Sequence, residues 1–433
     1  MTTKITEQNI SNLANLGVQW QSVHVADGST ALSVTAGKGY FINTTSGAQT
    51  VNLPNTATRG DTIILKDYAG TWGSNAVTIS STLKISGADA NGTLDTNNTT
   101  VTIVFIDTTK GWMAVQNSTQ GALATDTTYI TATGGTVTTS GDFKIHSFTG
   151  DGNFVVSQAG VGSGPSVVDY LVVAGGGAGA TWGGGGGGAG GLRESHSTPV
   201  SGSYTASPLA TPTGITVSVQ TYPIVVGGGG AAAPSYPAGG ATSGSNSSFS
   251  TITSTGGGVG GSTGPGGPAT GRNGGSGGGG HCSTCNGGSG NTPPVSPPQG
   301  NNGGGGGNSS PNNFFFGGGG GGAGQAGNAA RTVPAPGTHD GGPGGNGVTT
   351  NITGSPVTYG GGGAGGNVTT GAATGGSGGG GTASPQGTTP TPGTANTGGG
   401  GAGAWSPNVT GSSSTASGAG GKGIVILRYK FQN

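Results

Sequence analysis

Long runs of glycine dominate the second half of this chain and limit what it can fold into. Runs of four or more begin at Gly183, Gly227, Gly277, Gly303, Gly317, Gly360, Gly378 and Gly398. Each glycine costs about 1 kcal/mol relative to alanine in an α-helix, so the runs exclude that structure. They form either flexible linkers or polyproline II-type helices, which have three residues per turn and lie close enough for their backbones to hydrogen-bond.

The flexible-linker interpretation conflicts with the rest of this region. Four apolar strands lie among the runs: "DYLVVAGG", "GITVSVQTYPIVVGGGG", "SSFSTITSTGGG" and "GKGIVILRYKF". Disorder usually accompanies high net charge, whereas Arg272, Arg331 and Asp340 are the only charged residues between Pro199 and Gly421. We therefore predict packed glycine helices whose ends are held by a β framework.

Residues 175–180 offer a competing interpretation, a dinucleotide site. They follow an apolar strand and fit the pattern G-x-G-x-x-[GA]. In that motif a pyrophosphate lies on the N-terminus of the next helix, but residues 181–191 are almost all glycine and cannot form one. The ribose-binding acid expected about 20 positions later could only be Glu194, with no predicted strand before it. We expect a glycine helix and no cofactor.

Composition divides the chain into four predicted segments, and the predicted fold class is all-β. Residues 1–19 precede the first strand. Residues 20–118 alternate short β-branched runs with Gly, Asn and Asp turns, which predicts an independent antiparallel sandwich or barrel with Trp72 or Trp112 buried in it. Residues 119–165 form a β connector with one apolar face. Residues 166–433 form a glycine-rich domain of short strands, polyglycine II-type helices and long surface loops.

Charge and hydropathy narrow the choice of partners. The chain has 13 basic and 13 acidic residues, so no basic field attracts nucleic acid. No stretch reaches the roughly 18 apolar residues of a membrane span, and the N-terminus lacks the apolar core of a signal peptide. We expect synthesis in a cytoplasm, no membrane insertion and no nucleic-acid partner.

Three stretches resemble the structural and tail-fibre proteins of tailed phages, especially those of marine bacteria and cyanobacteria. They are "GKGYFINTTSGAQTVNLPNTATRGDTIILKDYAGTWGSNAVTI" with "VFIDTTKGW", the connector "ITATGGTVTTSGDFKIHSFTGDGNFVVSQAG", and the segment that opens with "VDYLVVAGGGAG" and closes with "GKGIVILRY". The resemblance implies a virion protein, a homotrimeric fibre or adhesin made in the host cytoplasm. Residues 1–19 then attach it to other tail or virion proteins. Its glycine-rich loops contact a host glycan or outer-membrane protein.

His281-Cys282-Ser283-Thr284-Cys285 is the sharpest chemical cluster. Cys-x-x-Cys supplies half a zinc site or a redox pair, and His281 would be a third ligand. No fourth ligand or second Cys-x-x-Cys lies near it in the sequence, so we expect a local disulfide or two free thiols rather than a metal. A trimer would bring three copies together, which keeps the metal alternative open.

Acidic residues are too sparse for glycan cleavage, which needs a pair of carboxylates flanking the bond. After Glu194 the only acid is Asp340. The acids of the β module lie in turns, where Asp hydrogen-bonds its own backbone; they are Asp61, Asp67, Asp89, Asp95 and Asp107. We predict an adhesin and no enzyme. The alternatives are a tailspike-like polysaccharide depolymerase and a capsid or tail decoration protein without a receptor.

Aromatic residues in the loops are the candidate receptor contacts, because exposed aromatics favour recognition surfaces and stack on sugar rings. The candidates and their polar neighbours are Phe314, Phe315, Phe316, Asn312, Asn313, His281, Tyr236, Tyr359 and Trp405. In the alternative interpretation they cap glycine helices or pack at a trimer interface. We place the host-contacting tip in "HCSTCNGGSGNTPPVSPPQGNN" and "NSSPNNFFF", where prolines limit the freedom of the unbound loop.

Overall fold

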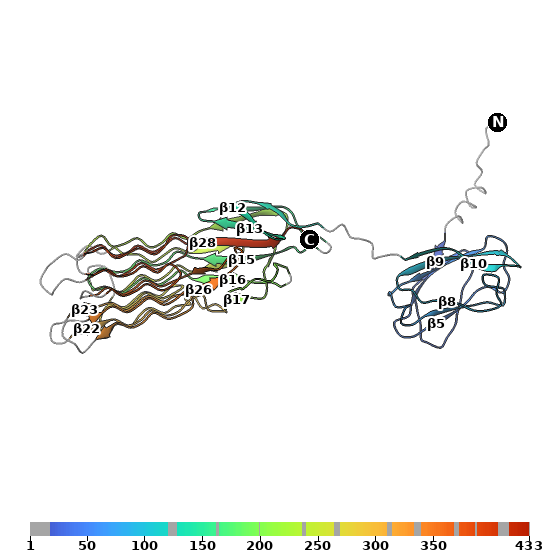
Figure 1. Cartoon of the computed structure of the whole chain (residues 1–433), viewed down its shortest axis with the longest axis horizontal. Coiled ribbons are helices and arrows are strands. Elements are labelled where there is room, and N and C mark those ends of the chain that lie inside the picture. The colour runs from blue at the N-terminus through green and yellow to red at the C-terminus, as the bar shows by residue number, and fades with distance from the viewer. Residues whose placement is uncertain are drawn as a thin grey trace, which may run out of the picture. The chain divides into compact units, whose positions relative to one another are not determined.

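The structure is a computed structural model in which all regular secondary structure of the described residues is β. These residues are 18–119, 128–161, 164–198, 200–235, 240–263, 269–309, 314–332, 339–367, 372–385, 388–405 and 415–432. They divide into two compact units, Met1–Ala124 and Thr125–Asn433 (Figure 1). None of the described residues forms a helix of the length and apolarity that crossing a membrane requires. The predicted all-β fold class is confirmed.

The first unit is a sandwich of two sheets around one apolar core. The first sheet contains β1 (Gln19–Trp20), β2 (His24–Val25), β4 (Lys38–Asn43), β6 (Thr62–Asp67), β9 (Thr99–Asp107) and β10 (Gly111–Thr119), in the order β1-β4-β6-β9-β10 with β2 also on β4. The second contains β3 (Leu32–Ser33), β5 (Gln49–Asn52), β7 (Val77–Ser80) and β8 (Gly92–Leu94), in that order. Trp72 and Trp112 are both fully buried in the shared core, as predicted.

Consecutive strands from β3 to β7 alternate between the two sheets. Strands that are two apart in the sequence therefore lie in the same sheet and run in the same direction. The pairs β4–β6 and β5–β7 are parallel. The pairs β6–β9, β9–β10 and β7–β8 are antiparallel. The expectation of an antiparallel module is wrong for the first half of this unit, because alternating apolar residues predict a strand but not its direction.

Several acidic residues of this unit hold turns, as the sequence predicts. The carboxylate of Asp67 accepts hydrogen bonds from the N–H groups of Gly70 at 2.9 Å and Asn98 at 2.9 Å. Asp107 accepts from Thr109 and Lys110, both at 2.8 Å, and these bonds lower the pKa of its carboxyl group. Both carboxylates are therefore engaged in hydrogen bonds with backbone N–H groups.

The second unit joins two sheets to a bundle of glycine runs. Its larger sheet contains β12 (Thr136–Ser140), β13 (Phe143–Phe148), β28 (Ile424–Lys430), β15 (Val167–Val173), β16 (Leu192–Ser195) and β17 (Ala210–Thr211), in that order, with β18 (Ile215–Thr216) also on β15. The other contains β11 (Thr131–Thr133), β14 (Gly152–Gln158), β19 (Gln220–Val225), β20 (Ser247–Phe249) and β21 (Ile252–Ser254). Hairpins pair β22 (Gly307–Ser309) with β23 (Phe314–Phe316), β24 (Arg331–Thr332) with β25 (His339–Asp340), and β26 (Val348–Thr350) with β27 (Val357–Tyr359).

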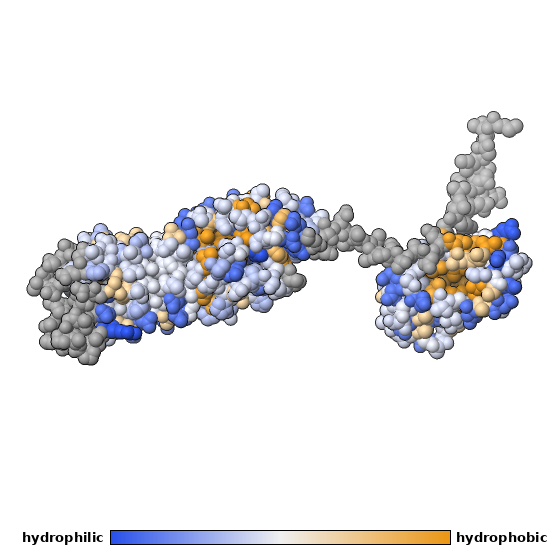
Figure 2. Space-filling model, in the orientation of Figure 1, coloured by the Kyte–Doolittle hydropathy of each residue, from blue (hydrophilic) through white to orange (hydrophobic). Residues whose placement is uncertain are grey.

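The last strand of the chain completes the larger sheet. β28 lies between β13 and β15 and is antiparallel to both. Phe154, Tyr170, Phe249 and Tyr429 belong to the apolar core between the two sheets. Figure 2 shows orange, apolar residues over these strands and pale residues along the glycine runs. The sheets therefore supply the side-chain packing that the glycine runs lack.

The glycine runs form the lattice of polyglycine II helices. In residues 175–180, N–H groups three positions apart bond to the same neighbouring segment, at 2.9–3.1 Å. The three pairs reach glycine runs 185–188 and 418–421 and the Ser- and Thr-containing segment 242–245. The carbonyl groups of the same residues accept from Gly230 and from runs 257–260 and 401–404. A period of three with bonds in several directions is the packing expected of such helices. This confirms the predicted glycine helix at residues 175–180.

Close approach of the backbones explains why the runs are glycine. A Cβ atom placed on Gly177 would lie 2.3 Å from the carbonyl oxygen of Gly258, and one on Gly187 would lie 2.0 Å from that of Gly177. Such contacts are far shorter than van der Waals separation. Backbone packed directly on backbone is thus the interior of this part of the molecule.

Candidate functional site

The glycine-rich bundle has two different ends. The sheets lie at one end, and the hairpin β22–β23 lies at the other (Figure 1). Run 175–180 leaves β15 and turns at Trp182 before run 185–188 returns antiparallel to it. Trp182 therefore marks the end away from the sheets, which we call the loop end; the opposite end is the sheet end.

Three rings from distant parts of the chain meet at the loop end. The ring centroids of Trp182 and His281 are 6.0 Å apart, those of Trp182 and Phe315 are 6.0 Å apart, and those of His281 and Phe315 are 5.1 Å apart. The side chains of Trp182 and Phe315 are half-buried, whereas His281 is fully buried. We call Trp182, His281 and Phe315 the tip cluster.

Trp182 has an unusual backbone conformation. Its φ is +60°, in the left-handed region, where a residue with a bulky side chain is an outlier costing about 1–2 kcal/mol. Glycine would have no such cost and is the commonest residue on both sides. Strain of this kind is concentrated at functional sites. Trp182 is not among the residues predicted from the sequence, although it is the single bulky residue between two glycine-rich runs.

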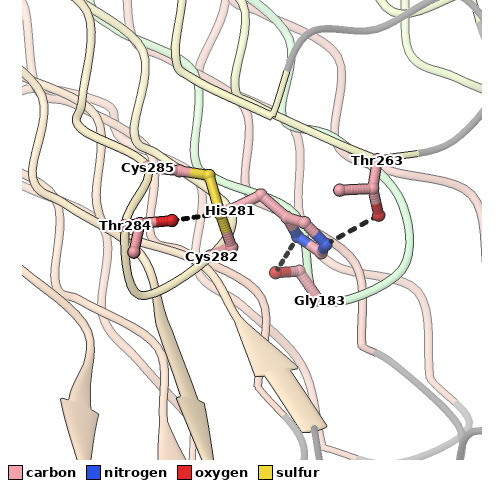
Figure 3. Close-up of a disulfide and its surroundings, with 6 residues drawn as sticks. All are labelled: Gly183, Thr263, His281, Cys282, Thr284 and Cys285. Carbon is pink, nitrogen blue, oxygen red and sulfur yellow. Dashed lines mark hydrogen bonds between the residues drawn. A yellow bond between two sulfur atoms is a disulfide. The ribbon is translucent and has the colours of Figure 1, made fainter.

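Two hydrogen bonds fix the imidazole of His281 (Figure 3). Its Nδ1 donates to the carbonyl oxygen of Gly183 at 3.1 Å, and its Nε2 accepts from the hydroxyl group of Thr263 at 3.0 Å. Burial lowers the pKa of the imidazole to about 4, so the ring is neutral at pH 7. Its full burial removes His281 from the candidate receptor contacts, because the ring reaches no solvent.

A disulfide closes the turn that follows His281. It joins Cys282 to Cys285 (Figure 3), and the N–H of Cys285 donates to the carbonyl oxygen of Cys282 at 2.8 Å. Ser283 and Thr284 between them are exposed. The sequence left open a local disulfide, two free thiols or a metal site, and the structure contains the local disulfide. Within the described ranges, no group of three His, Cys, Asp or Glu side chains is placed to hold a metal ion.

A family model for a glycine-rich domain matches residues 149–430. The chain belongs to the glycine-rich domain family. The match begins just before β14 and ends on the last residue of β28, so it includes the glycine lattice and most of both sheets. Among curated proteins, no sequence matches the chain significantly.

The proline-rich part of the predicted tip lies at the sheet end of the glycine-rich domain. The backbone carbonyl of Gln299 accepts from the N–H of Leu192 in β16 at 2.8 Å, and its side-chain oxygen accepts from Thr255 at 2.9 Å. Placing residues 292–298 beside His281 at one tip is therefore wrong. Gly287 and Gly288 belong to a run that crosses the bundle between the two loops, and an extended run advances about 3.1 Å per residue.

The remaining candidates have different environments. Phe316 and Tyr359 are 0% and 4% exposed; they pack inside the domain, and this burial corrects their assignment as receptor contacts. Phe315 and Trp405 are half-buried. Trp405 lies at the loop end, because the N–H of the preceding Ala404 donates to Ala180 at 2.8 Å. Asn312, Asn313, Tyr236 and the side chain of Phe314 lie outside the described residues.

Glu194, the only candidate acid for the dinucleotide site, has a structural role. It lies in β16, a strand that the sequence analysis did not predict. Its carboxylate accepts from the N–H of Ser207 at 3.1 Å and from the hydroxyl of Thr350 at 2.6 Å. Burial raises the pKa of this carboxyl group. The contacts tie β16 to the loop after it and to the hairpin β26–β27.

Proposed function

We propose that this protein is a phage tail fibre or adhesin that binds the host cell surface through its loop end. The observation that carries the proposal is the tip cluster: a strained, half-exposed tryptophan supported by two further rings. A chain in which glycine is the commonest residue on both sides of residue 182 retains a bulky side chain there at an energetic cost. Binding is the most direct reason to keep that ring.

The scaffold behind the tip cluster suits recognition. Each glycine run is hydrogen-bonded to several neighbours, so the rings project from a backbone with little freedom to move. Function commonly resides in loops on a rigid scaffold, and a preorganised surface loses less entropy on binding. Half-exposed Trp182 and Phe315 fit a host glycan, because aromatic faces pack against sugar rings. An outer-membrane protein is the other candidate ligand.

The resemblance to phage tail proteins supplies the remaining parts of the proposal. The fibre is a homotrimer on the virion, and residues 1–19 join it to other tail or virion proteins. The first unit is then a spacer between the virion and the glycine-rich domain. In this proposal the protein performs no catalysis.

The test replaces Trp182 with glycine. Glycine adopts a φ of +60° without strain, so Trp182→Gly removes the ring while the turn keeps its shape. Asn396 is the matched control: its φ is +61°, and it precedes Gly398, whose N–H bonds to Lys422 next to β28 at the sheet end. We expect Trp182→Gly to weaken host adsorption roughly thirtyfold, as loss of a central aromatic contact of about 2 kcal/mol would.

Asn396→Gly should adsorb like the wild type, and both variants should melt within a few degrees of it. Normal adsorption by a folded Trp182→Gly variant would contradict the proposal. Phe315→Ser is a second probe, since it leaves buried Phe316 in place. Shortening of host polysaccharide by the purified protein would instead favour the depolymerase. Labelling on the capsid, with no effect of either variant on adsorption, would favour the decoration protein.

A further inference from the structure

A polar pocket lies beside the end of β28 and shares no residue with the tip cluster. It is lined by Arg428, Tyr204, Ser140, Ser203, Thr205, Asn351 and Gly354, and its volume is about 390 Å³. Hydroxyl and amide groups therefore surround a single charged residue. No part of the proposed tip contributes to this pocket.

The Arg428 guanidinium is fixed at the base of this pocket. Arg428 is 4% exposed. Its Nε donates to the carbonyl oxygen of Ser201 at 3.0 Å, and its Nη1 donates to that of Ile352 at 3.1 Å. The guanidinium carbon is 4.6 Å from the ring centroid of Phe143 and 5.1 Å from that of Tyr204. Backbone carbonyls and aromatic rings thus hold it in one orientation.

These two bonds leave most of the guanidinium's donors available to a ligand. A guanidinium has five N–H groups and no acceptor, and the two hydrogen bonds to carbonyls use one N–H each. The guanidinium carbon lies over the rings of Phe143 and Tyr204, which accept no conventional hydrogen bond from its N–H groups through their carbon atoms. Arg428 is one of the residues that line the pocket.

The charge of Arg428 also lacks a directly paired carboxylate among the described residues. Asp169 interacts with it electrostatically, but the oxygens of Asp169 accept from the hydroxyls of Ser195 at 2.7 Å and Ser197 at 2.8 Å, from the N–H of Ser197 at 2.8 Å, and from the hydroxyl of Ser201. Ser201 links the two groups, since its carbonyl accepts from Arg428. The N–H groups of Arg428 that these two carbonyls do not use are the donors that an external anion in the pocket would bind.

We propose that this pocket binds the carboxylate of an acidic sugar. A planar guanidinium edge matches a carboxylate with two parallel hydrogen bonds. The hydroxyl groups of Ser140, Ser203 and Thr205 and the amide of Asn351 match the hydroxyl groups of a sugar ring. This site is independent of the tip cluster, so the protein would have two glycan contacts at opposite ends of the glycine-rich domain.

The test uses the full chain with D-glucuronate and D-glucose as probes, titrated by NMR or calorimetry. We expect glucuronate to bind about tenfold or more tightly than glucose, because only glucuronate carries the carboxylate. Equal binding of the two sugars overturns the proposal. Inorganic phosphate that displaces glucuronate with equal affinity also overturns it, since the pocket would then be an unselective anion site.

Ser203 provides the matched variants, because it is exposed at the rim of the pocket. Ser203→Glu places a carboxylate beside Arg428 and should abolish glucuronate binding. Ser203→Gln has nearly the same size without the charge and should retain it. If Ser203→Glu binds glucuronate like the wild type, or if both variants lose it equally, the guanidinium is not the binding group.

Discussion

Replacing Gly187 with alanine tests whether backbone contact is the core of the glycine-rich domain. The added Cβ atom would lie 2.0 Å from the carbonyl oxygen of Gly177, whereas ordinary contact begins at 3.4 Å. The run that contains Gly177 must therefore retreat by about 1.4 Å. That carbonyl accepts from Gly401 at 2.9 Å, and the N–H of Gly177 donates to Gly188 at 2.9 Å. Neither bond survives such a displacement.

The expected cost follows from these contacts. Two broken hydrogen bonds that leave buried groups unsatisfied cost about 2–4 kcal/mol together, and overpacking adds about 1–3 kcal/mol. Alanine offsets about 0.4–1 kcal/mol of this cost, because it restricts the unfolded chain more than glycine does. The net loss in the free energy of unfolding is about 2–7 kcal/mol, or roughly 3–10 °C in the melting temperature of a unit of this size.

Calorimetry of the full chain measures this change, with Gly228→Ala as the control. Gly228 lies in another glycine run, and a Cβ atom there would meet nothing within 4 Å. Gly228→Ala should melt at or slightly above the wild-type temperature. If Gly187→Ala melts like Gly228→Ala, the lattice does not carry the stability of the domain, and the reasoning from close packing is refuted.

Three further predictions concern pH, folding and assembly. Burial holds the pKa of His281 at about 4 rather than 6.5, so the unfolded state binds more protons between these values. The domain should then lose up to about 3 kcal/mol as the pH falls from 6.5 to 4. In urea unfolding, the His281→Asn variant should lose less stability over this pH range than the wild type does. His24→Asn changes a residue of the other unit, so this variant should lose as much stability as the wild type. Residues 20–118 expressed alone should give β-type circular dichroism, and the absence of that signal would contradict an independent module. The full chain should sediment as a trimer of about 122 kDa, three times its 40.6 kDa, because slender glycine-rich domains bury little apolar surface alone; a stable monomer would contradict it.

The candidate site was only partly predictable. Cys282–Cys285 and Phe315 carry local signals, a short cysteine spacing and an aromatic triplet. Trp182 has almost no local sequence signal. It was selected as a candidate because its φ is +60° and because it contacts rings that are about 100 and 130 positions away in the sequence. The sequence does not distinguish Phe316 from Phe315. Adjacent strand residues point to opposite faces of a strand, and of these two side chains only that of Phe316 is fully buried.

The amino-acid sequence alone determined the type of structure in most of the described residues. Glycine runs cannot form α-helices or a side-chain core, alternating β-branched residues form strands, and aspartates beside turns bind their own backbone. These outcomes depend on the local chemistry of each residue, so they follow from local patterns.

Only the tertiary structure decided which segments are neighbours. One glycine run is chemically the same as another, so nothing local tells run 175–180 to lie against runs 185–188 and 418–421. The direction of β4 and β6, the insertion of β28 between β13 and β15, and the location of residues 292–298 at the sheet end are equally non-local. They depend on the path of the whole chain, because a backbone hydrogen bond is the same whichever glycine donates it.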